Sequence, residues 1–115
     1  MDNSEVIKAF GALSQPTRFA AFELLVKHAP EGLAAGKLAE LLAVPQNTLS
    51  SHLVILERDA GLIVGKRQGR TIIYRARIDR LSATLGFFMQ QCCQGRPEQC
   101  KQQTTLGGVS SDDRL

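Results

Sequence analysis

Apolar side chains recur every three or four positions along most of the chain, which is the spacing of one face of an α-helix. Between Glu5 and Leu13, for example, Val6, Phe10 and Leu13 fall on one side. The same spacing predicts helices over five ranges, namely residues 5–13, 16–29, 36–42, 46–59 and 79–94. Most of the fold should therefore be helical.

Residue types that start and stop helices mark the ends of these ranges. Ser4 is expected to cap the first helix, because its hydroxyl can accept a free backbone N–H, and Asp79 is expected to cap the last. Pro16 suits the first turn of the second helix. Pro45 separates the third helix from the fourth, since the residue before a proline disfavours helix. Gly61 is expected to end the fourth helix.

Two short ranges have a different pattern, rich in Ile, Val, Thr and Tyr. Residues 62–66 and 71–77 predict two strands, and the Arg67-Gln68-Gly69-Arg70 stretch between them predicts a β-hairpin with a basic tip. Residues 31–35 are expected to form a loop. The fold class that follows is α+β and mainly helical.

Size and composition limit the architecture to one domain, because 115 residues support a single modest core. We expect residues 1–100 to form it and residues 101–115, rich in Thr, Gly, Ser and Asp, to be a flexible tail. No apolar run is long enough to span a membrane, and no signal-peptide pattern is present. The cytoplasm is the expected compartment, with no membrane partner.

The net charge of +3 is unevenly distributed along the chain. Residues 61–80 contain six Lys or Arg and one acidic residue, whereas residues 1–60 have a balance of −2. Such a cluster fits a polyanion such as double-stranded DNA, with phosphates as the main contacts. A solvated basic hairpin without a partner is the alternative.

The third and fourth helices, joined by a short turn, have the pattern of a helix-turn-helix. Short uncharged side chains that can approach base edges gather at the start of the fourth helix, and they are Gln46, Asn47, Thr48, Ser50 and Ser51. The hairpin adds a second candidate set for the DNA backbone, and it consists of Lys66, Arg67, Gln68 and Arg70. The alternative is a small α+β domain with a solvated polar helix.

The chain resembles the ArsR/SmtB family of metal-responsive repressors over residues 9–78. The stretches that carry the resemblance run from Leu13 to Arg18, from Lys37 to Leu42, from Thr48 to Leu53 with Leu56, from Ala60 to Ile63 and from Thr71 to Arg75. The resemblance implies a winged helix-turn-helix with a two-stranded β-hairpin wing. It also implies an elongated homodimer, paired through the terminal helices, that binds an inverted repeat when no inducer is present. The expected dimer contacts are Val6, Phe10, Leu81, Leu85 and Phe88.

Four positions refine this resemblance. Pro45 and Ser51 stand where members often have Ser and a basic residue, so the base contacts of this chain should differ from theirs. His52 lies between leucines and is expected to be a half-buried packing residue in preference to a DNA contact. His28 is expected to complement the dipole at a helix C-terminus.

The three cysteines, Cys92, Cys93 and Cys100, lie within nine residues, which argues for a reduced thiol site in preference to a disulfide scaffold. They resemble the C-terminal trithiolate site of one arsenic-sensing branch of the family. The Cys-x-Cys pair of another arsenic-sensing branch is absent from residues 36–42, and Asp79 has no histidine beyond it to form the zinc site of a third. Three sulfurs without an imidazole suit a soft ion, and the count favours trivalent arsenic or antimony as the inducer.

Other uses of the cysteines remain open at this point. Cadmium or lead could be the inducer, and a reversible disulfide or simple burial would use the same residues. A small thiol reductase would need a nucleophile–base pair on a rigid scaffold, which the sequence does not contain, so an enzyme is not expected. A protein-interaction winged helix that binds no DNA is the third class, and the basic wing argues against it.

Overall fold

The computed structural model describes residues 1–92 of the chain. Its elements, in chain order, are α1 (Asn3–Leu13), α2 (Pro16–Lys27), β1 (Leu33–Ala34), α3 (Ala35–Leu42), α4 (Gln46–Val54), the π-helical turn η1 (Ile55–Asp59), β2 (Ile63–Gln68), β3 (Thr71–Ala76) and α5 (Ile78–Cys92). The α+β, mainly helical class predicted from the sequence is confirmed. None of these helices is both long enough and apolar enough to cross a lipid bilayer.

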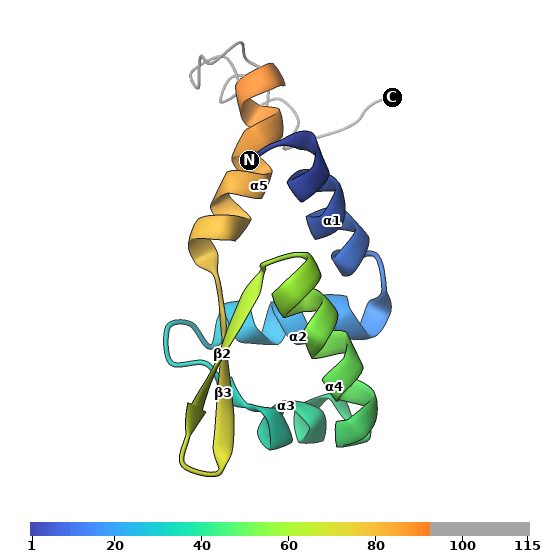
Figure 1. The fold of residues 1–115 in the computed structure, drawn as a ribbon, viewed down its shortest axis with the longest axis vertical. Helices are drawn as coiled ribbons and strands as arrows, with labels where there is room; N and C mark the ends of the chain where they lie inside the picture. Colours follow the sequence, from blue (N-terminus) through green and yellow to red (C-terminus); the bar gives the residue numbers. More distant parts are fainter. Residues whose placement is uncertain (93–115) are drawn as a thin grey trace, which may run out of the picture.

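The elements divide the molecule into two ends (Figure 1). Helices α1 and α5 lie side by side at one end, and α3, α4 and the β2–β3 hairpin occupy the other. Helix α2 crosses the middle and contacts α1, α3, α4 and β3. The two ends are also joined directly, since α1 contacts η1 and β3 leads into α5.

The starts of α1 and α5 differ from the sequence prediction. Asp2 caps α1 in place of Ser4: the Glu5 backbone N–H donates to Asp2 Oδ1 at 2.9 Å, and the Asp2 N–H donates to Glu5 Oε1 at 2.9 Å. This reciprocal capping box satisfies two N–H groups. Ser4 could not form one, because the residue three positions after it is Ile7 and not Glu or Gln. Helix α5 begins at Ile78, so Asp79 lies in its first turn and is not its cap.

The sheet has three antiparallel strands in the order β1-β3-β2. The predicted hairpin is confirmed, and its strands extend to Gln68 and Thr71, which leaves Gly69 and Arg70 as the turn. Residues 33 and 34, predicted as loop, instead pair with Tyr74 and Ile73 of β3. Two residues are too few to show the alternation of apolar and polar positions that predicts a strand, and the pairing with β3 sets their register. It fixes the base of the wing to the start of α3.

The hydrophobic core is built from apolar residues of α1, α2, α3, α4, η1 and β2. Its largest fully buried side chains are Leu25, Leu38, Leu49, Leu56, Leu62 and Ile63. Leu49, Leu53 and Leu56 thus bury the apolar face of the fourth predicted helix, as its periodicity indicated. The predicted single helix over residues 46–59 is α4 followed by η1, and the Ala60 N–H reaches back five residues to the Ile55 carbonyl. Gly61 ends it in the left-handed region with φ of 66°, as predicted.

Candidate nucleic-acid interface

Helices α3 and α4 are joined by a tight turn that the backbone of Ala43 makes possible. Ala43 has φ of 56° and ψ of 43°, the left-handed conformation that commonly ends a helix. Pro45 follows in extended conformation and occupies the N-cap position of α4. Neither α3 nor α4 receives a side-chain cap from the described residues. The Thr48 N–H donates to Oδ1 of Asn47 at 3.0 Å. The N–H groups of Gln46 and Asn47 are consequently the ones available to a DNA phosphate.

The polar face of α4 projects from the molecule opposite its buried leucines. All five candidate residues on it, Gln46, Asn47, Thr48, Ser50 and Ser51, are exposed. The Ser50 hydroxyl donates to the Gln46 carbonyl at 3.0 Å, and the Ser51 hydroxyl donates to the Thr48 carbonyl at 3.0 Å. Each hydroxyl oxygen keeps acceptor capacity for a base or a water. Gln46 presents an amide that both donates and accepts.

The wing presents positive charge that forms no ion pair with an acidic side chain of residues 1–92. Lys66, Arg67, Gln68 and Arg70 are all exposed. The ion pairs formed within residues 1–92 involve none of these three cations. Unpaired exposed guanidinium and ammonium groups suit contacts with phosphates.

The helix and the wing share one surface. A groove of about 370 Å³ lies between them, and its walls include Gln46 and Ser50 from α4 and Arg70, Thr71 and Tyr74 from the wing side. Three residues predicted separately from the sequence, Gln46, Ser50 and Arg70, therefore face the same space. The other candidate residues of α4 and the wing are exposed but do not line this groove. One ligand can contact both α4 and the wing, which is the arrangement a DNA duplex requires of a helix and a wing.

The carboxylate of Glu57 links the wing to η1, the turn that follows α4. Glu57 of η1 accepts a hydrogen bond from the Gly65 N–H of β2 at 2.9 Å through Oε2. A Cβ atom at Gly65 would lie 2.7 Å from Cε1 of Tyr74, so the ring covers the glycine closely. Burial, and then the nearby Glu57 charge, raise the pKa of the Tyr74 phenol. Sequence reasoning did not identify Glu57, because its partner is a backbone group eight residues away.

The two histidines behave as the sequence indicated. His52 is half-buried, and its Nδ1 lies 3.3 Å from the Arg18 guanidinium. His28 is the C-cap of α2, and its Nδ1 lies 2.9 Å from the Leu24 carbonyl oxygen. Arg18 itself was missed as a candidate residue, because its partners are scattered along the chain.

The face shared by α1 and α5 exposes a set of large apolar side chains. Ile7 is 68% exposed, Leu85 55% and Phe88 52%, and the Phe10 and Phe88 rings lie with centroids 5.9 Å apart. Two expected dimer contacts do not belong to this surface, since Val6 is only 3% exposed and Leu81 packs against the core. Their helical spacing was right, but both point inward between the helices of a single chain.

The predicted thiol site lies almost entirely outside the described residues. Cys92 is the last residue of α5, whereas Cys93 and Cys100 are beyond the described part of the chain. Within residues 1–92, no three His, Cys, Asp or Glu side chains gather as metal ligands would. Asp79 is paired with Arg77 at 2.8 Å, and this hydrogen bond lowers the pKa of the Asp79 carboxyl.

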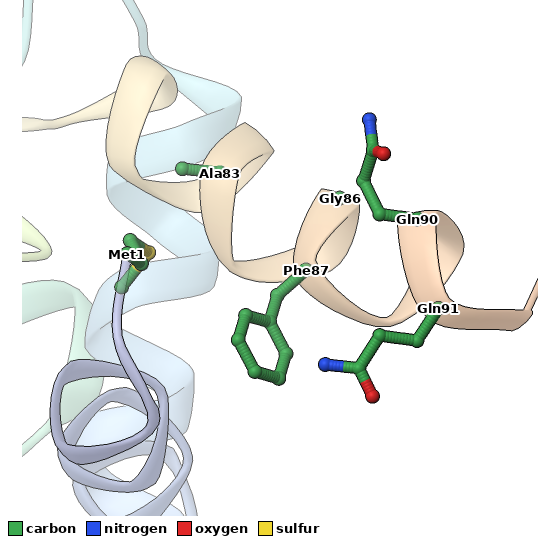
Figure 2. Close-up of a pocket in the computed structure, with 6 residues that line it drawn as sticks. All are labelled: Met1, Ala83, Gly86, Phe87, Gln90 and Gln91. Atoms are coloured by element: carbon green, nitrogen blue, oxygen red, sulfur yellow. The ribbon is translucent and has the colours of Figure 1, made fainter. Parts of the chain in front are cut away.

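The end of α5 that leads to Cys92 borders a hollow on the protein surface (Figure 2). Its volume is about 430 Å³, and Met1 faces the turns of α5 that carry Ala83, Phe87 and Gln91. Met1 Sδ also lies 3.4 Å from the Thr84 hydroxyl. The start of the chain thus packs against the helix that ends at the first cysteine.

Comparisons with known proteins place this geometry among DNA-binding regulators. A family model described as a helix-turn-helix domain matches residues 13–65. No curated protein matches the chain. An ArsR-like transcriptional regulator from Rhodococcus sp. RHA1 is 25% identical with a TM-score of 0.68, and the match covers 95% of each chain.

Two further solved structures extend the similarity. NolR from Sinorhizobium fredii is 32% identical with a TM-score of 0.58, over 75% of this chain and 83% of that one. The homodimeric winged helix-turn-helix DNA-binding domain of a possible ArsR-family regulator from Mycobacterium bovis has a TM-score of 0.59 at 22% identity, over 80% of this chain and 84% of that one. The winged helix-turn-helix fold is thereby confirmed, and family and fold are those of transcriptional regulators rather than of enzymes.

Proposed function

Because the chain belongs to the ArsR family of helix-turn-helix transcriptional regulators, we propose that it is a cytoplasmic repressor that binds an inverted-repeat operator as a homodimer. Trivalent arsenic or antimony is the proposed inducer, held by Cys92, Cys93 and Cys100. The observation that carries the DNA-binding part is the groove between α4 and the wing, where Gln46 and Ser50 face Arg70.

The two sides of this groove have different tasks in the proposal. The uncharged α4 side chains read base edges in the major groove, since amides and hydroxyls discriminate donor and acceptor patterns. Lys66, Arg67 and Arg70 hold the phosphate backbone and release its counterions, which makes binding dependent on salt. Gln68 lies on the same exposed strand and adds a polar contact.

A homodimer would bring two such surfaces to one duplex. The exposed apolar side chains of α1 and α5 support it, because a monomer in water would leave Ile7, Phe10, Leu85 and Phe88 uncovered. The homodimeric neighbour from Mycobacterium bovis supports it as well. A two-fold axis through this pair of helices would place two recognition helices on an inverted repeat.

The chemistry of the three cysteines supports the inducer. Thiolates are soft ligands, and trivalent arsenic and antimony take three of them. Structural zinc commonly takes four ligands, one more than these cysteines supply. Because Cys92 is continuous with α5, an ion held there acts on the helix that carries the proposed dimer contacts. Release of DNA then follows if the ion-bound dimer holds its recognition helices at another spacing, which is a coupling between two sites.

The test is operator binding by Cys→Ser variants under reducing conditions. A duplex selected by the wild-type protein from a random-sequence library is labelled, and fluorescence anisotropy follows its release during titrations of arsenite, antimonite, cadmium and zinc. We expect C92S, C93S and C100S to bind the duplex as the wild type does, and to resist arsenite. Loss of Cys92 or Cys93 should have a larger effect than loss of Cys100.

Each other outcome changes one part of the proposal. Release of the wild type by cadmium alone would replace the metalloid with a different soft ion. Release of all three variants at the wild-type arsenite concentration would locate the sensor elsewhere. A wild-type protein that selects no duplex would overturn the repressor itself.

A further inference from the structure

Arg18 of α2 joins three helices through one guanidinium group. Its Nε donates to the carbonyl of Ala12 near the end of α1 at 2.7 Å. Its NH1 lies 3.3 Å from Nδ1 of His52 on α4, across 34 positions of sequence. Its own position is fixed at the start of α2, where the Arg18 N–H donates to Oε1 of Gln15 at 2.8 Å. Arg18 is partly buried, so these contacts are shielded from water.

The contact with His52 determines which nitrogen of the ring carries a proton. A guanidinium has five donors and no acceptor. Nδ1 of His52 must therefore accept, which requires a neutral imidazole protonated on Nε2. A second proton would turn Nδ1 into a donor and place two cations against each other.

No other charged group offers His52 an alternative partner within the described contacts. The residues one turn away on its own helix are uncharged, and they are Thr48, Leu49, Ile55 and Leu56. From α1, the group next to Arg18 is the uncharged Ala12 carbonyl. Arg18 from α2 is thus the charge that faces the ring.

We propose that Arg18 is a positioning residue for DNA recognition, which fixes the orientation of α4 relative to α1 through neutral His52. This inference rests on the proposed function. It goes further by naming a physical link between the helix that carries Ile7 and Phe10 and the helix that carries the base-reading side chains. His52 lies one residue after Ser51 and one turn after Thr48, so a rotation of α4 at His52 moves those side chains directly.

Loss of the contact between Arg18 and His52 should therefore reduce discrimination between DNA sequences. Binding to random DNA should persist, since the exposed cations of the wing contact phosphates independently of this link.

The test compares operator and random duplexes at pH 7.5 for the wild type and four variants. R18K keeps the net charge but cannot reach both partners, so its preference for the operator over random DNA should fall about tenfold, the loss expected from one hydrogen bond to a charged group. H52A should show a similar loss. H52N should keep wild-type preference, because its amide oxygen takes the place of Nδ1 as the acceptor.

H28N is the matched control, because His28 is the other histidine of the chain and contacts Leu24 instead of α4. It should keep wild-type preference for the operator. Circular dichroism of each variant verifies the fold, and H52N tests the link even if R18K is unstable. Wild-type preference in R18K, or a loss in H52N equal to that in H52A, would overturn the inference. A wild type that binds both duplexes equally at pH 7.5 would instead overturn the proposed function.

Discussion

At the scale of single residues, the turn between α3 and α4 depends on an alanine in a conformation that favours glycine. Ala43 has positive φ and sits at the C-cap of α3. Its Cβ crowds the following carbonyl oxygen in this conformation, and the cost is about 1–2 kcal/mol. This cost falls in the turn that sets the direction of α4 relative to α3.

Replacing Ala43 with glycine should therefore stabilise the protein. We expect A43G to raise the free energy of unfolding by about 1 kcal/mol, since glycine carries no Cβ penalty at a left-handed C-cap. Urea denaturation measures the change. The control is G69A, in which an added Cβ meets open space at φ of 64°. The free energy of unfolding of G69A should fall by about 1 kcal/mol for the conformational reason alone. A fall in the free energy of unfolding of A43G as well would contradict the interpretation.

Glu5 gives a second prediction, on the pH dependence of stability. Hydrogen bonds from the Asp2 backbone and the Arg80 side chain lower the pKa of the Glu5 carboxyl from its ordinary value of 4.5. A lowered pKa in the folded state means that ionised Glu5 favours folding. This stabilisation is complete above pH 4.5 and is lost as the pH falls through the lowered pKa.

The variant E5Q measures this contribution. Its melting temperature should lie below that of the wild type at pH 6.5, and the two curves should converge toward pH 3. E31Q is the control, because Glu31 is exposed and forms no ion pair among residues 1–92. A constant gap between wild type and E5Q across the pH range would show that the glutamate acts by packing and not by charge.

Sequence patterns identified the exposed candidate residues on α4 and the wing, but not the buried contacts behind them. Gln46, Ser50 and Arg70 stand out because short polar or basic side chains cluster there. Arg18 and Glu57 do not, because each is one charged residue among many until the fold supplies its partner. Asp2 was missed for a different reason: its cap depends on Glu5 three residues later, and Ser4 has the same capping propensity.

At the scale of elements, periodicity fixed the helices because each buries one continuous face. Residues 46–59 show both the strength and the limit of this signal. Leu49, Leu53 and Leu56 are buried as expected, yet the change to π geometry at Ile55 leaves no mark in the pattern. Strand β1 was likewise hidden, because two residues are too few to show an alternation of burial.

The proposed roles of α4 in reading bases and of the wing in contacting phosphates lead to a third prediction. R67A and R70A should each weaken binding to operator and random duplexes alike, and reduce the slope of log affinity against log salt by about 1. Q46A and S50A should instead reduce discrimination between the two duplexes, with the salt slope unchanged. Anisotropy titrations over a range of salt concentrations measure both quantities. An altered sequence preference in the wing variants alone would reverse the assignment.

At the scale of the whole molecule, the two ends of the fold carry different surfaces. Figure 1 shows α3, α4 and the wing at one end and α1 with α5 at the other. The first end exposes the short polar residues of α4 and the cations of the wing, and the second exposes the large apolar side chains Ile7, Phe10, Leu85 and Phe88. The uneven distribution of charge along the sequence predicted the basic surface of the first end. The exposed apolar surface of the second end was predicted only in part. Helical spacing identifies an apolar face, but it does not say whether that face packs against the same chain or against a partner.

The fourth prediction concerns this apolar end. F88E should convert a dimer to a monomer in sedimentation velocity at micromolar concentration, because a charge buried without a partner opposes association. Operator affinity should fall with it. F19E is a matched control, since Phe19 and Phe88 are both 52% exposed but Phe19 belongs to α2. A wild-type monomer, or a dimer that survives F88E, would contradict this interface.

The strand order β1-β3-β2 has a consequence beyond DNA. Strand β2 pairs with β3 on one side only within the described residues. Glu57 accepts the Gly65 N–H on the other side, and the rest of that side can still pair with the edge of another sheet. Lys66 and Arg67 lie on this open edge. Like charges oppose the approach of a second edge of the same kind, which is how natural sheets resist aggregation. The basic residues of the wing should thus also oppose edge-to-edge aggregation of the protein when no DNA is bound.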